Sequence, residues 1–261
     1  MTGFPTVTDM DSILITPLTE RPSLTSRLYE MTETWPAFIP QDLVAGALLS
    51  RVAEDFPEYC VVATDGDRVV ARGLSVPFDA GLDGREEMPD KGWDQVLVWA
   101  YRDRHLGNAP TTASALEITV DTEYLGRGLS YRMLTALRDG ARRQGHDALL
   151  APVRPTAKHL EPRVPMADYI RRRREDGLPA DPWLRVHVKS GGSVEKVATA
   201  SMTVSGSLAQ WRQWTGLPFD SDGDIDVPGA LVPVHCDTAH DRAVYVEPNV
   251  WIRHGVRPST T

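Results

Sequence analysis

The clearest alternation of apolar and polar residues in the chain lies directly before a glycine-rich segment. Leu116, Ile118 and Val120 alternate with polar residues, which is the period of two of a half-buried strand. After the glycines, apolar residues recur at helical spacing from residue 129 to residue 144, and arginines occupy much of the remaining surface. An apolar stretch at residues 148–153 predicts another strand. The segment is therefore predicted to form a strand, a glycine turn, an amphipathic helix and a strand.

Similar patterns predict further elements on both sides of this segment. A glycine turn at residues 65–67 separates apolar runs at residues 59–63 and 69–76, which predicts a β-hairpin. A loop of about twenty residues is expected after it, longer than loops usually run, and is a candidate specificity element. The remaining predictions are strands at residues 13–15, 94–101, 199–204 and 243–246, helices at residues 24–29, 43–52 and 208–214, and a helix after Pro165 that carries the arginines 171–174. Together these elements predict a mixed α/β fold.

The glycine turn has the chemistry of a phosphate-binding loop. The first amides of a helix have no intrahelical acceptor, and the helix dipole adds positive charge at that end. Gly126 and Gly128 lack side chains that would keep a ligand away from these amides, and Arg127 adds a charged donor. The turn has neither the Lys-Ser/Thr pair of a P-loop nor the third glycine of a dinucleotide fingerprint. A pyrophosphate is therefore the predicted anion.

This turn resembles the central signature of the GNAT superfamily of N-acyltransferases, which reads Arg or Gln, two residues, Gly, one residue, then Gly or Ala. Gly126, Arg127 and Gly128 fit the signature, whereas Leu125 replaces its first residue and Ser130 replaces its last. The resemblance implies that acetyl-CoA or another acyl-CoA is the co-substrate, with its pyrophosphate on the loop amides. The implied contacts are made by Leu125, Gly126, Arg127, Gly128, Leu129 and Ser130, and by the backbone of Ile118 and Val120 along the acyl and pantetheine portion.

The resemblance also implies the architecture of the whole chain. The family has a central mixed, mostly antiparallel sheet flanked by helices, and residues 1–261 are expected to form a single domain of this kind. Residues 154–181 depart from the minimal family pattern and are expected to form an insertion, and residues 193–261 an extended C-terminal part. In these features the chain resembles a larger, actinobacterial-type subgroup.

Two residues are catalytic candidates under this resemblance. Residues 186–192 resemble the family motif Leu-Tyr-x-Lys-x-Gly-Phe and place His187 at the tyrosine, which in the family protonates the departing thiolate. An imidazole titrating near neutrality would serve as this acid, or as the base for the amine, or would only make a hydrogen bond within its helix. Glu117 lies on the strand beside the expected acyl group, and alternation places it on the face opposite Ile118, toward either the amine or solvent.

Composition limits the classes of partner and compartment. A formal net charge of −8 argues against nucleic acid, and no apolar stretch is long enough to span a bilayer, so no membrane association is expected. The two cysteines, Cys60 and Cys236, indicate free thiols rather than a secretory framework, which predicts a cytoplasmic protein. No His, Cys or carboxylate cluster has metal-site spacing, so no metal is expected. The arginines 171–174 are interpreted as a solvated surface rather than a phosphate site.

The sequence therefore predicts an enzyme that moves an acetyl or other acyl group from acyl-CoA to the amine of a small molecule, by direct transfer in a ternary complex. One alternative donor is the phosphopantetheine thioester of an acyl carrier protein. A second alternative is a non-catalytic acyl-CoA-binding domain. A homodimer is compatible with each of these interpretations.

Overall fold

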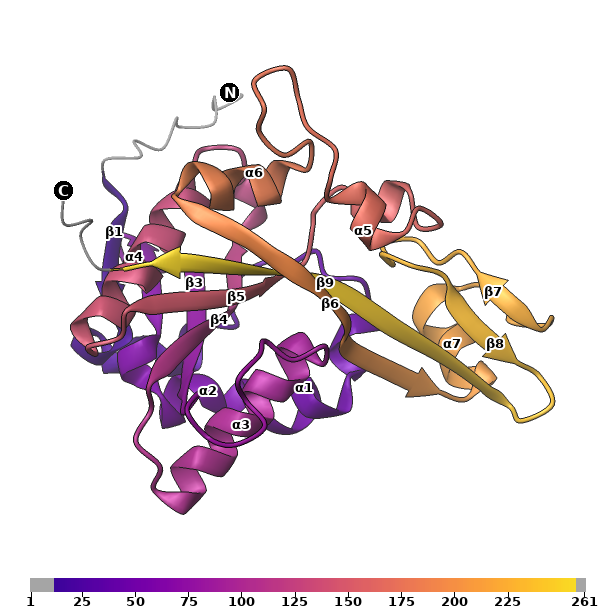
Figure 1. Cartoon of the computed structure of the whole chain (residues 1–261), viewed down its shortest axis with the longest axis horizontal. Helices are drawn as coiled ribbons and strands as arrows, with labels where there is room; N and C mark the ends of the chain where they lie inside the picture. Colours follow the sequence, from indigo (N-terminus) through magenta and orange to yellow (C-terminus); the bar gives the residue numbers. More distant parts are fainter. Residues whose placement is uncertain (1–11, 257–261) are drawn as a thin grey trace, which may run out of the picture.

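The computed structural model describes residues 12–256, and a nine-stranded sheet runs through them (Figure 1). The strands are β1 (Leu14–Pro17), β2 (Val61–Asp65), β3 (Arg68–Phe78), β4 (Thr112–Val120), β5 (Ala148–Val153), β6 (Gly192–Gly206), β7 (Gly223–Ile225), β8 (Val234–Asp237) and β9 (Arg242–Gly255). Their order in the sheet is β1-β2-β3-β4-β5-β9-β8-β7, and β6 pairs with the other edge of β9. Every pair is antiparallel except β4 with β5, so the predicted mostly antiparallel sheet is confirmed.

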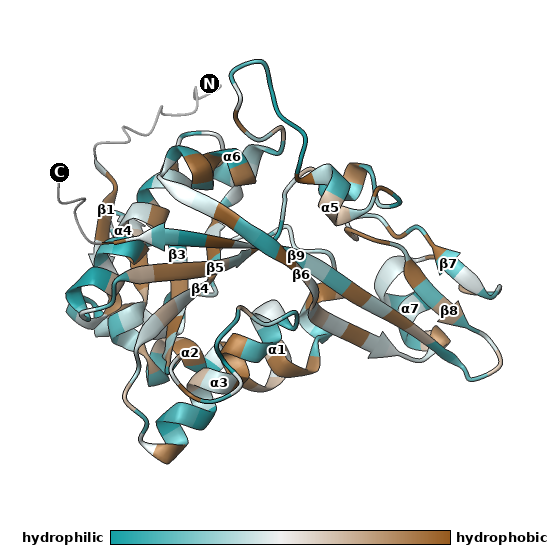
Figure 2. Cartoon of the chain, in the orientation of Figure 1, coloured by the Kyte–Doolittle hydropathy of each residue, from teal (hydrophilic) through white to brown (hydrophobic). Residues whose placement is uncertain are grey.

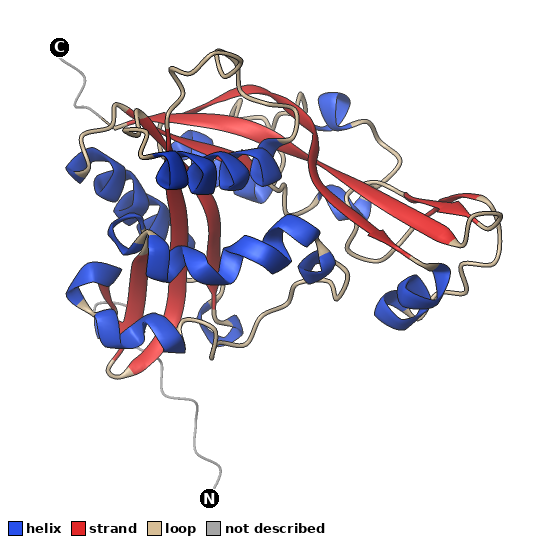
Figure 3. Cartoon of the chain, turned by 90° about the horizontal axis from the view of Figure 1, so that it is seen from below, coloured by secondary structure: helices blue, strands red, loops and turns tan. Residues whose placement is uncertain are grey.

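Helices cover the sheet and connect its strands. They are α1 (Leu43–Leu48), α2 (Val52–Asp55), α3 (Gly92–Leu106), α4 (Leu129–Arg143), α5 (Met166–Tyr169), α6 (Pro182–Lys189) and α7 (Leu208–Thr215). Single 3₁₀ turns or short runs lie at Leu18–Glu20, Pro22–Arg27, Ile39–Gln41, Leu49–Arg51, Pro57–Tyr59, Thr122–Tyr124 and Lys158–Leu160. In Figure 3 the helices lie over the central strands, while the β6–β9 ribbon continues beyond them toward α7. Brown, hydrophobic segments alternate with teal ones along these helices and strands in Figure 2, as expected for elements with one buried face.

The predicted hairpin and the strand–turn–helix–strand unit are both confirmed. Gly66, at φ +57°, makes the turn between β2 and β3. Helix α4 buries Leu129, Met133 and Leu137 against β3 and β4, which is the apolar face that the sequence showed. The helix ends before Gly145, a glycine with φ +85°.

Strands β4 and β5 separate soon after they pair. Their only paired positions are Ala113 with Leu149 and Ser114 with Leu150. The register of β3 against β4 also shifts at Leu74/Ser75, so Leu116 lies in a bulge. Its carbonyl accepts a hydrogen bond from the Trp93 indole at 2.9 Å instead of from a strand. Beyond this point the two parallel strands leave a gap whose walls are the remainder of β4 and β5.

The predicted strand at residues 94–101 is wrong, because these residues belong to helix α3. Trp93, Val96, Leu97 and Ala100 are buried at the spacing of one helical face. This face packs against β3 and against β6, and β6 begins only at Gly192, far along the sequence from α3. The predicted loop of about twenty residues is also too long, since β3 continues to Phe78 and α3 begins at Gly92.

The arginines 171–174 do not lie on a helix as predicted, because α5 ends at Tyr169. Their side chains are exposed, and three of them form ion pairs with the nearby carboxylates of Asp168, Glu161 and Asp176. The loop that carries them is teal in Figure 2, between α5 and α6. The alternative of a phosphate site gains no support from these contacts.

The segment at residues 154–181 is anchored by two buried polar groups. The fully buried Lys158 ammonium donates to the carbonyls of Glu161, Pro162 and Leu231. Asp181 caps α6 by accepting from Trp183 N and Leu184 N, and its other oxygen accepts from Ala157 N and Tyr169 OH. Because α6 carries His187, these contacts fix that histidine relative to β5.

Asp94 provides a test of stability against pH. Burial, and then the charge of Asp42, raise the pKa of Asp94 to about 8, and its Oδ1 has no hydrogen-bond partner in residues 12–256. Between the ordinary value of 3.8 and 8, the folded protein keeps a proton that the unfolded chain releases. The protonated Asp94 carboxyl therefore contributes its full share of the folding stability below about pH 4, and this contribution is lost as the pH rises through 8.

We expect Asp94→Asn to be more stable than the natural protein at pH 8, by roughly 2 kcal/mol. This value is smaller than the full pKa shift would give at about 1.36 kcal/mol per pKa unit, because the carboxyl keeps some contact with water. The advantage should shrink toward pH 4. Urea unfolding at both pH values measures it, and the exposed Asp83→Asn is the control. An advantage that is equal at both pH values would contradict the assignment of the raised pKa.

Candidate functional site

A cleft of about 510 Å³ occupies the gap between the diverging strands. Its walls are formed mainly by β4 and β5, the segment between β1 and α1, the start of α4, and α6, with a few residues of α1, β3, α3, β6 and β9. They include Tyr29, Glu33, Trp35, Arg72, Leu116, Glu117, Ile118, Val120, Leu125, Ser130, Pro152, Arg154, Trp183, His187 and Glu247. The sheet thus opens next to the glycine turn, so the predicted phosphate loop and the predicted catalytic residues border one space.

The glycine turn has the geometry of an anion site. Gly126 and Gly128 have φ values of +74° and +78°, and a Cβ at either position would meet no protein atom within 4 Å. Gly128 precedes α4 without any side-chain cap. The backbone amides from Gly126 to Tyr131 make no hydrogen bond to another described residue. Six unpaired donors at a helix start fit a pyrophosphate, whereas a side-chain cap would have competed for them.

Strand β4 and the glycine turn that follows it both border the cleft. Ile118, Val120, Leu125 and Ser130 line it, while Leu129 is buried beneath the loop. The Arg127 guanidinium lies 5.5 Å from the Tyr124 ring centroid. The cofactor contacts assigned to these residues remain a prediction, and their placement is consistent with it.

Glu117 is one of two carboxylates on a buried arginine. Arg72 Nε donates to Glu117 at 2.5 Å, and Arg72 Nη1 donates to Glu33 at 2.6 Å and to the Leu28 carbonyl. The Tyr29 ring covers the guanidinium at 4.5 Å. Glu117 therefore points toward Arg72 and the cleft rather than toward open solvent, and its side chain is only 10% exposed.

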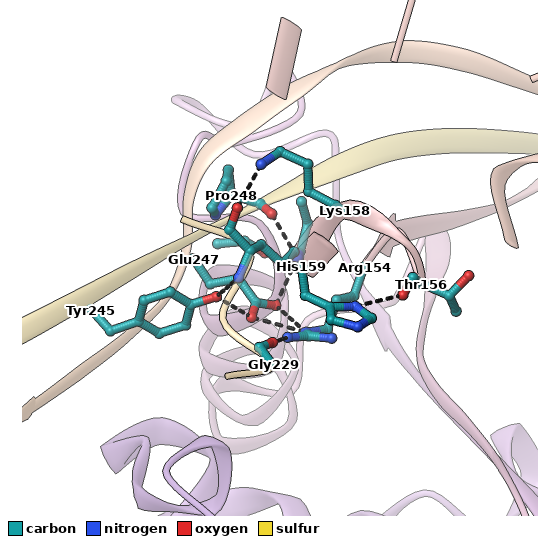
Figure 4. A network of polar contacts seen from close by, with 11 residues as sticks. Arg154, Thr156, Lys158, His159, Gly229, Tyr245, Glu247 and Pro248 are labelled. Atoms are coloured by element: carbon teal, nitrogen blue, oxygen red, sulfur yellow. Dashed lines mark hydrogen bonds and ion pairs between the residues drawn. The ribbon is translucent and has the colours of Figure 1, made fainter. Parts of the chain in front are cut away.

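A second buried ion pair lies across the end of β5. Glu247 is fully buried and accepts two hydrogen bonds from Arg154 Nε, one from Tyr245 OH and one from Asn249 Nδ2 (Figure 4). Arg154 also donates to the Gly229 carbonyl. The carboxylate is thereby satisfied, and burial of the glutamate is offset by good geometry. Arg154 also reaches the cleft, where its guanidinium lies 5.9 Å from the Trp35 ring.

His187 lines the cleft but is almost fully buried. Its Nδ1 is 2.9 Å from Nε2 of His254, and the Trp183 ring packs edge-on with a centroid distance of 4.5 Å. Burial, and then the neighbouring His254, lower the pKa of His187 to about 3. The expectation that this imidazole titrates near neutrality is therefore wrong, because the ring is neutral throughout the physiological range. Its role at the thioester remains a prediction, now for a neutral ring.

The cleft also contains residues that the sequence did not single out. Arg72, Glu33 and Glu247 line it and carry charges, and His254 lies behind it within hydrogen-bond distance of His187. Each is a common residue in an ordinary strand or loop, with no motif around it. Only the fold brings Arg72 to Glu117, across 45 residues of sequence.

Two other kinds of site are absent from the described chain. In residues 12–256, no group of three or more His, Cys, Asp or Glu side chains is placed to hold a metal ion. No helix in that same range is long and apolar enough to cross a membrane.

Comparisons with known proteins agree with this geometry. No family model matches the chain. The arginine N-acetyltransferase avaD of Aspergillus versicolor is 32% identical over 268 residues, which cover 90% of this chain and 91% of that protein. The loading GNATL domain of CurA from Lyngbya majuscula has a TM-score of 0.58 at 16% identity, and covers 94% of this chain and 98% of its own. The GphF GNAT-like decarboxylase, solved with isobutyryl-CoA, has a TM-score of 0.55 at 15% identity, covering 94% and 99%. The last two show a shared fold.

Proposed function

The chain belongs to the GNAT superfamily of N-acyltransferases, and from this we propose that it transfers an acyl group from acyl-CoA to the amine of a small molecule. The observation that carries the proposal is the cleft between β4 and β5, which joins a set of unpaired loop amides to buried ionisable groups. The name of the relative in Aspergillus versicolor supports a small amine as acceptor.

The loop and the strands position the donor in this proposal. Amides of residues 126–131 bind the pyrophosphate, and Arg127 adds a contact near it. Ile118 and Val120 border the pantetheine and acyl portion along β4. When bound, acyl-CoA would supply the activated acyl group, which the amine takes as an amide while the thiolate departs and is protonated by solvent.

The remaining residues handle protons and charge. Glu117, directly or through a water molecule, takes the proton that the acceptor amine loses. His187 faces the sulfur and stabilises it by donating a hydrogen bond as the C–S bond breaks. No covalent enzyme intermediate is needed, because the cleft holds the donor beside a wall that accepts the amine.

Thiol release from acetyl-CoA, followed with a panel of small amines, tests the proposal. Amine-dependent release together with an acylated product would support it. If the protein binds no acyl-CoA but accepts an acyl group from a carrier protein's phosphopantetheine, the donor assignment is wrong and the alternative donor holds. Saturable binding without turnover of any amine would favour the non-catalytic alternative.

A further inference from the structure

The two buried ion pairs of the cleft expose opposite charges. On the Arg72 side, the guanidinium is 3% exposed and the Glu33 carboxylate is 28% exposed. On the other side, Glu247 is 0% exposed and Arg154 is 18% exposed. Glu33 and Arg154 both line the cleft. A ligand in this cleft therefore meets a carboxylate at one place and a guanidinium at another.

A ligand without charges would be a poor match for this surface. It would remove water from the exposed parts of Glu33 and Arg154 without replacing the hydrogen bonds to that water, and this desolvation is costly even for a charge that already has an ion-pair partner. A ligand with the opposite charges replaces both. Guanidinium groups bind carboxylates with two parallel hydrogen bonds, which also fixes orientation.

We propose that the acceptor is an amphoteric amine, with a carboxylate that binds Arg154 and a second cationic group that binds Glu33. This inference rests on the proposed function and specifies its acceptor. Basic α-amino acids have this combination of groups. Arg154 immediately follows β5, which places the carboxylate, and the amine next to it, at the end of the cleft where the strands diverge.

Four amines form a square that tests the two charges separately. L-arginine has both groups, agmatine lacks the carboxylate, L-norvaline lacks the second cation, and butylamine lacks both. We expect kcat/KM to fall at least tenfold for each missing group, as for removal of a charged hydrogen bond in a buried site. Calorimetric binding of the same amines to the protein–CoA complex should give the same order, whether or not turnover is observed.

Variants assign each group to its partner. Glu33→Gln should raise KM for arginine and agmatine and leave KM for norvaline unchanged. The paired change Arg154→Met with Glu247→Gln avoids leaving Glu247 unpaired. It should raise KM for arginine and norvaline and leave KM for agmatine unchanged. Butylamine acylated as well as arginine would overturn this inference and leave the proposed function standing. Failure to acylate any amine, with arginine still binding in preference to butylamine, would overturn the proposed function alone.

A separate observation concerns three polar groups behind the cleft. His187 Nε2, His254 Nδ1 and Arg138 Nε are all buried without a hydrogen-bond partner among residues 12–256. They lie close together, since His187 Nδ1 is 2.9 Å from His254 Nε2 and Arg138 Nη2 donates to the carbonyl of Gly255, the residue after His254. Burial, and then the charge of Arg138, lower the pKa of His254 to about 4. Arg138 is fixed by hydrogen bonds to the carbonyls of Ser190 and Gly255. Gly192 makes room for these groups, because a Cβ there would lie 2.6 Å from the His254 ring.

The Arg138 cation determines where the protons lie. His254 Nε2 faces His187, and Arg138 is held at the carbonyl of Gly255, the residue after His254. A nearby cation disfavours a second donor proton on the ring, so we place the lone pair of His254 on Nδ1. The His254 proton is then on Nε2 and is donated to His187 Nδ1. His187 must consequently carry its own proton on Nε2, on the ring side away from His254. Buried hydrogen-bond donors without an acceptor are rare. Such a donor at a binding cleft indicates that its acceptor is supplied by a bound ligand.

The geometry points to Arg138 and His254 as positioning residues that keep His187 in the Nε2–H tautomer, as a neutral hydrogen-bond donor to the thioester sulfur. His187 transfers no proton in this scheme, and the thiolate gains its proton from solvent after it departs. Because both rings are neutral above about pH 4, the donor is available throughout the physiological pH range.

Nitrogen-15 NMR of histidine-labelled protein tests the tautomer without any substrate. The His187 and His254 signals, assigned from the His187→Gln and His254→Gln spectra, should both show protonated Nε2 and unprotonated Nδ1. His254→Leu should lower kcat about tenfold at unchanged KM for acyl-CoA. His254→Gln, whose amide reaches the position of Nε2–H, should restore most of it. A His187 signal with protonated Nδ1, or equal kcat in the Gln and Leu variants, would overturn the assignment.

Discussion

A Gly128→Trp variant is expected to bind acetyl-CoA at least 100-fold more weakly than the natural protein, equivalent to about 2.7 kcal/mol. Gly128 has φ +78° and its amide precedes α4 in the row of unpaired donors. A Cβ there would meet no protein atom, so the indole would fill the space that the pyrophosphate is proposed to occupy. Calorimetric titration with acetyl-CoA measures the change directly.

Gly177→Trp is the matched control for this variant. Gly177 has φ +75°, a Cβ added there would also meet no atom within 4 Å, and the residue lies in the exposed loop between α5 and α6. Both substitutions therefore carry the same backbone strain, about 1–2 kcal/mol for an L residue in this conformation. We expect Gly177→Trp to bind acetyl-CoA normally. Equal affinity in Gly128→Trp and the natural protein would remove the phosphate loop from the proposed site.

The unit around this loop could be predicted because its signals are local. The period of two in β4, the two glycines and the apolar face of α4 all lie within about thirty residues, and each depends on short-range geometry. The same holds for the hairpin turn at Gly66. Local patterns of this kind predict the structure correctly because the face that is apolar in the sequence is also the face that the sheet buries.

Helix α3 shows where local patterns are insufficient. Val96, Leu97 and Val98 are consecutive apolar residues, which fit a short buried strand as well as one turn of a helix. The choice depends on Trp93 and Ala100, which complete a helical face only when β6 is present to cover it. Residue 192, where β6 begins, is far from α3 in the sequence.

The charged residues of the cleft illustrate the same limit for the site. Glu117 is recognisable from its strand, but its electrostatic environment depends on Arg72 and Glu33, which come from other elements. His187 is recognisable from its motif, yet its neutrality follows from burial against Trp183 and from His254. Local patterns supply the candidates, and the fold determines their charge state.

Glu117→Gln is expected to lower kcat by about 100-fold at saturating acyl-CoA and amine, the usual cost of losing a general base. The amide keeps the size of the side chain and loses the ability to take the amine proton. KM for acyl-CoA should remain the same, because the phosphate loop is untouched. The measurement is steady-state thiol release over a range of both substrates, together with calorimetric titration with acetyl-CoA.

Glu33→Gln separates this role from the support of Arg72. Both variants remove one carboxylate from the same guanidinium, so both disturb the ion pair alike. Because Glu33 is assigned to the acceptor's cation, its loss should appear in KM for arginine, with kcat retained. Loss of kcat in both variants would mean that the charge balance around Arg72 matters and that Glu117 is not the base. A normal kcat in Glu117→Gln would mean that a water molecule, and not Glu117, accepts the proton, since the amine must still lose its proton before it attacks.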